Sequence, residues 1–316
     1  MDEKLLITEM LKGFSRSGRQ RNRPFECDAE IIDINGALYG FSMDDFSFDE
    51  DGFKNKNLET LGKNLAVATI SDLLAAGCSP DFYMHAIATP DDAFAVSISK
   101  GIKETLEKCA CFLIGGDIGM SPRWRYTGVA FGAFGEFSPL TRIIPNDRQN
   151  IWVTGQIGDA NLSLLTGLET PEFELRLEES RDMRQRATAA IDTSGGLMES
   201  LWTLHRLNHG RKFHLETNLM PFDPAVMSFC RENVLSPVAF LYGGAGEYEI
   251  LFTADENENF SSARKIGTID DTDINDNSGA LYLDGVKIEK PPPGPRDFNS
   301  RDAYIRKILE VVNESF

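Results

Sequence analysis

The chain has 316 residues and is strongly acidic, with 49 aspartates and glutamates against 32 lysines and arginines and a formal net charge of −17. This charge argues against a nucleic-acid partner, because binding to a phosphate backbone requires a basic face. No apolar run approaches the roughly 18 residues of a membrane span, and the N-terminus lacks the basic segment and apolar core of a signal peptide. We therefore expect a cytoplasmic protein with no nucleic-acid partner and no membrane partner.

The length and composition favour two globular domains, since a typical domain has ~150 residues. Hydrophobic residues make up 41% of the chain and charged residues 26%, which is ordinary for globular proteins. The polar stretch at 145–150 is the predicted boundary, so we expect an N-terminal domain at 1–147 and a C-terminal domain at 148–316. Five scattered cysteines, an odd number, argue against a disulfide framework.

The predicted elements of the first half alternate between helical and strand periods. The pair Asn35-Gly36 predicts a tight hairpin, and the arginine-rich segment 14–24 is predicted to be a loop. In chain order we expect a helix at 3–12, strands at 29–34 and 37–43, a helix at 57–76, a strand at 82–88, a helix from about 91 to 109, a short buried strand at 111–114 and an alternating segment at 126–137.

The second half has the same mixture of elements, which together predict an α/β (α+β) protein. Asp223-Pro224 is a typical helix start, with a capping acid followed by proline. We expect strands at 151–154, 188–192 and 248–252, helices at 196–208, from 224 and from about 300, and a hairpin at 281–288.

Aspartates at the ends of predicted strands are the most informative feature of the sequence. Asp44, Asp117 and Asp192 each follow a strand, and ligand sites of α/β proteins gather at such ends. Asp72 instead lies on the apolar stripe of a helix, where a carboxylate needs a partner such as a divalent cation. Each acid alone could equally be a cap, a turn residue or a surface charge. Together they favour Mg²⁺, which takes hard oxygen ligands and bridges phosphates.

Glycine turns and clustered arginines supply the backbone N–H groups and positive charge that phosphate chemistry needs. The loop from Gly13 to Arg23 adds cations, although its composition also fits a disordered arm. No Walker loop and no Gly-x-Ser-x-Gly turn is present. The Cys109/Cys111 and His205/His209 pairs lack the partners of a zinc site. The glycines stand at 115, 116, 155, 158, 195, 196, 243, 244 and 246.

Eight segments match, in order and spacing, the pattern of a known enzyme family. They cover residues 27–29, 42–44, 61–80, 115–117, 153–160, 191–197, 246–252 and 266–269. In these segments the chain resembles thiamine-monophosphate kinase and, more distantly, the PurM-like superfamily. That superfamily contains aminoimidazole ribonucleotide synthetase, selenophosphate synthetase and a hydrogenase maturation factor. The resemblance extends from about residue 25 to residue 270.

The resemblance implies a two-domain PurM-like fold that binds ATP and Mg²⁺ in the cleft between its domains. N-terminal domains would pair in a homodimer whose strands form a β-barrel, and the C-terminal domain would be α+β. The metal-binding acids would be Asp28, Asp44, Asp72, Asp117 and Asp192, of which Asp72 and Asp117 would be catalytic together with Arg142. Nucleotide neighbours would be Lys63, Gly115, Gly116, Gly155 and Ser194, with Arg16 and Arg19 in a segment over the triphosphate. Glu247 and Tyr248 would contact the acceptor substrate.

Several positions depart from the kinase pattern. Gly195 stands where a second acid is usual, Cys27 replaces the first of two adjacent acids, and Thr69 replaces an asparagine. The segment 51–53 keeps only the phenylalanine of the family's substrate-holding residues, and a C-terminal aromatic motif is missing. The ATP and Mg²⁺ residues are therefore largely kept, while the acceptor pocket differs.

Three functions are compatible with this sequence. The first is an ATP- and Mg²⁺-dependent phosphotransferase that moves the γ-phosphoryl group of ATP to a small, phosphorylated acceptor without a side-chain nucleophile. The second is a synthetase that activates an amide or carbonyl oxygen as a phosphate ester for displacement by an amine. The third is a nucleotide-binding maturation or regulatory protein without turnover.

Overall fold

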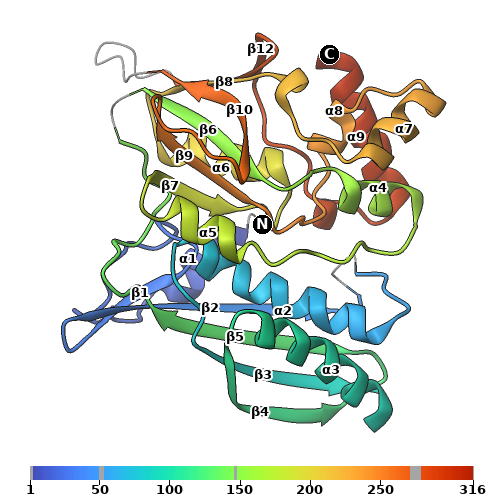
Figure 1. Cartoon of the computed structure of the whole chain (residues 1–316). Coiled ribbons are helices and arrows are strands. Elements are labelled where there is room, and N and C mark those ends of the chain that lie inside the picture. The colour runs from blue at the N-terminus through green and yellow to red at the C-terminus, as the bar shows by residue number, and fades with distance from the viewer. Residues whose placement is uncertain (1–2, 50–52, 146–147, 271–278, 316) are drawn as a thin grey trace.

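The computed structural model describes residues 3–49, 53–145, 148–270 and 279–315, and contains two β-sheets with helices around them (Figure 1). The first sheet has five strands in the order β1-β2-β5-β3-β4. Its strands are β1 (Glu30–Ile34), β2 (Ala37–Ser47), β3 (Phe82–Thr89), β4 (Phe112–Met120) and β5 (Arg125–Ala133). The β3 and β4 strands pair in parallel, and the other neighbours are antiparallel. The helix α1 (Glu3–Leu11) precedes this sheet.

The predicted hairpin and long helix of the first half are confirmed. Asn35 and Gly36 have φ values of 55° and 89°, the left-handed conformations that a tight turn between β1 and β2 requires. Helix α2 (Leu58–Ala75) starts at Asn57, whose side chain accepts from the amides of Glu59 and Thr60, and is followed by Gly77 with φ 77°. Helix α3 (Asp92–Lys108) connects β3 to β4, as a parallel pair requires.

The second sheet has seven strands in the order β12-β11-β8-β10-β6-β9-β7. Its strands are β6 (Gln149–Thr154), β7 (Ala187–Asp192), β8 (Lys212–Leu215), β9 (Ile250–Asp255), β10 (Ala263–Ile269), β11 (Ala280–Leu283) and β12 (Val286–Ile288). The helices of this half are α4 (Asp159–Thr166), α5 (Leu177–Met183), α6 (Leu197–Leu207), α7 (Pro224–Asn233), α8 (Val238–Leu241) and α9 (Arg301–Ser315). Short 3-10 turns cover Thr217–Leu219 and Pro295–Asp297. The Asp223 carboxylate caps α7 as predicted.

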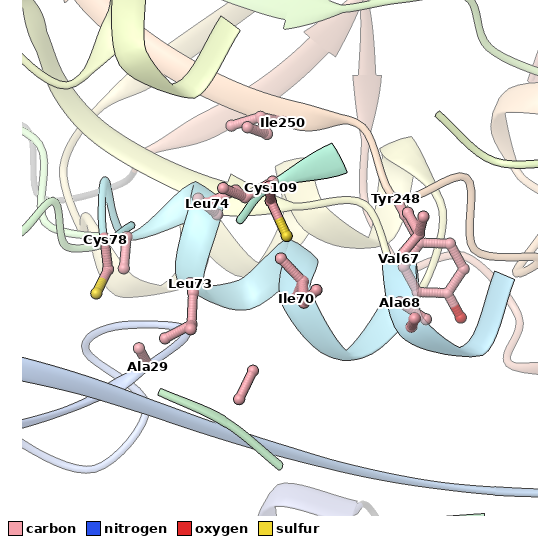
Figure 2. Close-up of a cluster of buried hydrophobic side chains, with 14 of the residues drawn as sticks. Ala29, Val67, Ala68, Ile70, Leu73, Leu74, Cys78, Cys109, Tyr248 and Ile250 are labelled. Atoms are coloured by element: carbon pink, nitrogen blue, oxygen red, sulfur yellow. The ribbon is translucent and has the colours of Figure 1, made fainter. Parts of the chain in front are cut away.

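Helix α2 lies between the two sheets and is buried along most of its length. It contacts β2 and β5 of the first sheet and β7 and β9 of the second. Figure 2 shows Leu73 and Ala29 on one side of this helix and Leu74 and Ile250 toward the other. One apolar core therefore continues across the junction of the sheets. A polar or charged side chain of α2 that is buried in this core needs a hydrogen-bond partner or a counter-charge.

Two strand predictions are wrong in ways that matter for the site. The predicted buried strand at 111–114 is the nine-residue β4, which is exposed along most of its length, so Gly115, Gly116 and Asp117 lie inside a strand. The strand predicted to end at 43 continues to Ser47, which places Asp44 within β2, opposite Gly128 of β5. Long pairing with a neighbour overrode the weak strand propensity of glycine and aspartate.

The mixed α/β class is confirmed, with each sheet drawn from one half of the chain. Among the described residues the first sheet stays open, with β1 and β4 at its edges, so one chain does not close a barrel. The predicted division at 147/148 falls next to residues 146–147, which lie outside the described residues, and stays a prediction. None of the helices in the described ranges is long and apolar enough to cross a lipid bilayer.

Candidate metal and nucleotide site

Three carboxylates from distant parts of the chain meet at the junction of the sheets. Asp28 precedes β1, Asp72 belongs to α2, and Asp192 ends β7. One oxygen of each lies within 4.8 Å of an oxygen of the others. Such an arrangement of hard oxygen donors suits a divalent cation.

Asp28 is held by a cation and by a backbone amide. Its Oδ1 accepts from Nε of Arg142 at 2.6 Å, and its Oδ2 accepts from the amide of Asp192 at 2.9 Å. The side chain is only 1% exposed. Burial raises the pKa of Asp28 to about 6, against the lowering effect of Arg142. Burial opposes the charge of Arg142 as well, but the carboxylates of Asp28 and Asp72 outweigh it, so the arginine pKa is raised.

Asp192 accepts from two serine hydroxyls. Ser71 donates to Oδ2 at 2.6 Å, and Ser194 donates to Oδ1 at 2.9 Å. Ser200 of α6 donates to the carbonyl of Asp192 at 2.7 Å and so fixes the turn after β7. Ser71 was not predicted as a site residue, although its position directly before Asp72 on α2 was a usable signal.

Asp72 has no such partner. Among the described residues, none donates a hydrogen bond to its carboxylate, although burial and the negative charges of Asp44 and Asp192 raise its pKa well above the ordinary value. A buried carboxylate among other carboxylates needs a cation to remain ionised. The residues present therefore fit Mg²⁺, with Asp72 as the carboxylate of the three that lacks a hydrogen-bond donor among the described residues.

The other two predicted metal acids lie at different distances from this cluster. Asp44 is close enough for its charge to act on Asp72. Asp117 lies on β4 in the row of Ala86, Thr127 and Asp45, three strands away from β2. Three strand spacings are roughly 14 Å, so one chain does not bring Asp117 to the three clustered carboxylates.

Of the predicted nucleotide neighbours, one contacts a carboxylate of the cluster and the others lie elsewhere in the fold. Ser194 contacts the cluster directly, whereas Gly115 and Gly116 lie on β4, where a Cβ at Gly116 would stand 2.6 Å from the carbonyl oxygen of His85. Gly155 has φ 56°, and its missing side chain leaves room for the ion pair of Arg176 and Glu249.

Lys63 lies on a different face of α2 from the cluster. It pairs with Glu104 and Glu172 and is nine residues from Asp72, which is about 14 Å along a helix and about half a turn around it. Lys63 lines a cavity of about 530 Å³ between α2, α3 and the segment 172–179. The walls of this cavity include neither Asp28, Asp72 nor Asp192.

The arginine-rich N-terminal segment is docked on the first sheet. The amide of Arg21 donates to Ile31, and the amide of Asp33 donates to the carbonyl of Arg19, so this stretch runs beside β1. The guanidinium of Arg16 contacts Glu30 at 2.6 Å. The described part of this segment is therefore an ordered edge rather than a disordered arm, and Arg19 stays exposed.

Glu247 and Tyr248 are both buried. The Glu247 carboxylate accepts from the amide of Gly158 at 2.5 Å and from Asn161, and burial followed by the charge of Asp159 raises its pKa well above the ordinary value. The Tyr248 ring lies 4.8 Å from that of Phe173 and 6.3 Å from that of Phe53. Figure 2 shows Tyr248 beside Val67 and Ala68 of α2.

Comparison with known proteins finds a matching family model and related kinases. Residues 27–136 match the family model described as "AIR synthase related protein, N-terminal domain". The thiamine-monophosphate kinase of Pyrococcus horikoshii is 25% identical over 209 residues, which are 62% of this chain and 65% of that enzyme. The Archaeoglobus fulgidus thiamine-monophosphate kinase is 26% identical over 243 residues, 73% of this chain and 78% of that enzyme.

The chain resembles the thiamine-monophosphate kinases in sequence and in fold. A structure described as AaThiL complexed with AMPPCP and TMP has a TM-score of 0.74 at 20% identity and covers 90% of this chain and 93% of that chain. Escherichia coli HypE, a hydrogenase maturation protein, has a TM-score of 0.66 at 17% identity over 92% of this chain and 97% of that chain. The resemblance predicted from the sequence motifs is confirmed, and the fold is that of the thiamine-monophosphate kinase-like, PurM-like proteins.

Proposed function

We propose that the chain is a cytoplasmic ATP- and Mg²⁺-dependent phosphotransferase that transfers the γ-phosphoryl group of ATP to a small, phosphorylated acceptor. The observation that carries the proposal is the meeting of Asp28, Asp72 and Asp192 within 4.8 Å at the junction of the sheets. Carboxylates gathered in this way hold the Mg²⁺ that accompanies ATP, and phosphoryl transfer needs little beyond positioning and charge stabilisation. Sequence relatives that match over more than 200 residues of this chain include thiamine-monophosphate kinases.

In this proposal Asp72, Asp192 and Asp44 hold Mg²⁺, which would neutralise charge on the phosphates. Asp28 joins them and orients Arg142, which is the only cationic side chain in ion-pair contact with any of the three carboxylates among the described residues. Ser71 and Ser194 fix the Asp192 oxygens. Arg142 stabilises negative charge on the transferred group, and Arg16 and Arg19 lie in the N-terminal segment proposed to cover the triphosphate.

The acceptor side of the proposal rests on Glu247 and Tyr248. Tyr248, Phe53 and Phe173 form a largely buried aromatic cluster of tilted rings, against which a ring of the acceptor would pack. Tyr248 is 8% exposed and Glu247 6% exposed, so an acceptor reaches them only when a covering segment moves. The departures from the family pattern at Gly195 and at 51–53, of which 51–52 lie outside the described residues, leave the acceptor open to experiment.

We also propose that the chain is a homodimer paired through β4. This edge strand exposes five large apolar side chains, including Phe112 at 67% and Met120 at 68%, and an unpaired apolar edge favours pairing with another chain. The same strand carries Asp117, Gly115 and Gly116. A partner's β4 would bring these groups to a site that one chain leaves incomplete.

The deciding experiment is ADP release by the purified chain with ATP, Mg²⁺ and a panel of acceptors that starts with thiamine monophosphate. We expect acceptor-dependent ADP release that Asp72→Asn abolishes, with Asp302→Asn as a surface control. Amine-dependent ADP release would favour the synthetase instead. Tight ATP binding without turnover on any acceptor would favour the regulatory protein.

A further inference from the structure

Glu199 lies beside the turn that carries Asp192, on the first turn of α6. A Cβ atom built at Gly195 would stand 2.9 Å from Oε2 of Glu199 and 3.3 Å from its Cδ. Gly195 directly follows Ser194, whose hydroxyl donates to Asp192. The Glu199 carboxylate is therefore folded back over the turn between β7 and α6.

Gly195 and its neighbour Gly196 are glycines for different reasons. Gly196 has φ 86°, and a Cβ there would meet the carbonyl oxygen of Gly243 at 2.3 Å, so its backbone requires glycine. Gly195 has no positive φ, so other residues could adopt its backbone conformation. The space above Gly195 is filled by Glu199. At this position glycine makes room for a carboxylate that comes from the next helix.

Only one oxygen of Glu199 is engaged. Oε1 accepts from the hydroxyl of Thr203 at 3.0 Å, which fixes the side chain along α6. Within the described part of the chain, no group donates to Oε2, the oxygen that faces Gly195. The side chain is partly buried. A fixed carboxylate oxygen without a donor, over the turn that follows Asp192, is a suitable ligand for a hard cation.

We infer that Glu199 is an additional ligand of the divalent cations at this site and supplies, over Gly195, a carboxylate that the turn itself lacks. This inference rests on the Mg²⁺ site of the proposed function. It assigns a metal-binding role to a residue that lies outside the three clustered carboxylates. It also predicts that the carboxylate can be moved from Glu199 to position 195 without loss of metal binding.

The test measures metal binding directly, by the electron paramagnetic resonance signal of free Mn²⁺ titrated into the full chain, with and without AMPPCP. Glu199→Gln keeps the oxygen that accepts from Thr203 and removes the charge, and we expect Mn²⁺ affinity to fall about tenfold. The relocation variant Gly195→Asp/Glu199→Gln should return the affinity to within about threefold of the wild type. Glu178→Gln, in the first turn of α5, is the matched control and should bind Mn²⁺ like the wild type.

Unchanged Mn²⁺ affinity in Glu199→Gln would overturn the inference. So would a loss that the relocation variant does not restore, because that result makes Glu199 a packing residue of α6. A wild-type chain that binds no Mn²⁺ in either condition would overturn both the inference and the metal site. Metal binding that behaves as expected without any ADP release would contradict the proposed kinase alone.

Discussion

The buried ion pair between Arg176 and Glu249 offers a quantitative test of how this protein supports its site. Nε and Nη2 of Arg176 donate to the two oxygens of Glu249 at 2.6 and 2.5 Å. The Glu249 side chain is 6% exposed and also accepts from Thr154. The backbone of Glu249 exchanges hydrogen bonds with Thr193, next to Asp192. Arg176→Met would leave this carboxylate buried without its cation.

The cost of that substitution can be bounded. Two charge-assisted hydrogen bonds contribute about 3 to 6 kcal/mol, but Glu249 can take up a proton instead of remaining as an unpaired charge. From an ordinary pKa of 4.5, protonation at pH 7 costs about 3.4 kcal/mol, and at pH 5 it costs about 0.7 kcal/mol. The destabilisation caused by losing the charge pair therefore cannot exceed about 3.4 kcal/mol at pH 7 or about 0.7 kcal/mol at pH 5.

The sign of this dependence follows from the direction of the pKa shift. Burial raises the Glu249 pKa even with Arg176 present, so its stabilising contribution is complete below pH 4.5 and is lost as the pH rises through the folded pKa. Removing Arg176 raises that pKa further and extends the loss to higher pH. The deficit of Arg176→Met relative to the wild type should therefore grow from pH 5 to pH 8.

Urea unfolding followed by tryptophan fluorescence at pH 5, 7 and 8 measures this deficit. The double variant Arg176→Met/Glu249→Gln should recover most of the stability at pH 8, since a neutral amide replaces the buried charge. Arg181→Met, which removes an exposed ion pair of α5, should change the free energy of unfolding little. A deficit equal at all three pH values, or a double variant no better than the single one, would refute the reasoning.

Three further predictions concern other buried or shared groups. Glu247→Gln keeps the oxygen that accepts from Gly158 and removes a carboxyl whose pKa is raised by burial. Thermal melts should therefore show a higher melting temperature than the wild type at pH 8 and no such gain at pH 5. Mixing inactive Asp72→Asn and Asp117→Asn subunits should restore up to about a quarter of the wild-type ADP release if each site draws on both subunits. The thiols of Cys27 and Cys78, whose pKa burial raises to about 12, should react with a thiol reagent only after unfolding.

Each of these predictions has its own control. Glu310→Gln on the exposed face of α9 should leave the pH profile of stability unchanged, and a Glu247→Gln variant that is less stable at pH 8 would contradict the argument. No activity after mixing the two inactive variants, under conditions that exchange subunits of the wild type, would place Asp117 outside the site. Rapid labelling of the native chain would show that these thiols are open to solvent.

Local signals predicted the elements that depend on local chemistry. Asn35-Gly36 predicted the β1-β2 turn, and Asp223-Pro224 predicted the start of α7, because caps and turns act within a few residues. The extent of β4 was missed because residues 115–119 hold three glycines, and only the parallel pairing with β3 makes a strand of them. Side-chain exposure on β4 likewise depends on what lies beyond the edge of the sheet.

The site shows the same limit at the level of single side chains. Ordered motifs predicted that Asp28, Asp72 and Asp192 share a function, and the fold brings them within 4.8 Å. The hydrogen-bond partners of each carboxylate could not be predicted, because most of these partners lie more than 100 residues away in the chain. Arg142 and the amide of Asp192 donate hydrogen bonds to Asp28, and Ser71 donates one to Asp192. The position of the Glu199 carboxylate over Gly195 depends on the side-chain rotamer of Glu199, which a sequence motif cannot specify.

These partners compensate part of the negative charge that the three carboxylates bring to the junction of the sheets, even without a metal ion. Each carboxylate taken from water needs compensation, and Arg142 supplies one positive charge while the two serines and one amide supply neutral donors. Asp72 has no hydrogen-bond donor among the described residues, and burial together with the neighbouring carboxylates raises its pKa. A divalent cation would remove this remaining imbalance, so its binding should stabilise the chain, and Asp72→Asn should raise the melting temperature without Mg²⁺ while it abolishes the increase that Mg²⁺ produces in the wild type. Equal Mg²⁺-induced shifts in both proteins would show that the imbalance at Asp72 is not what the metal corrects.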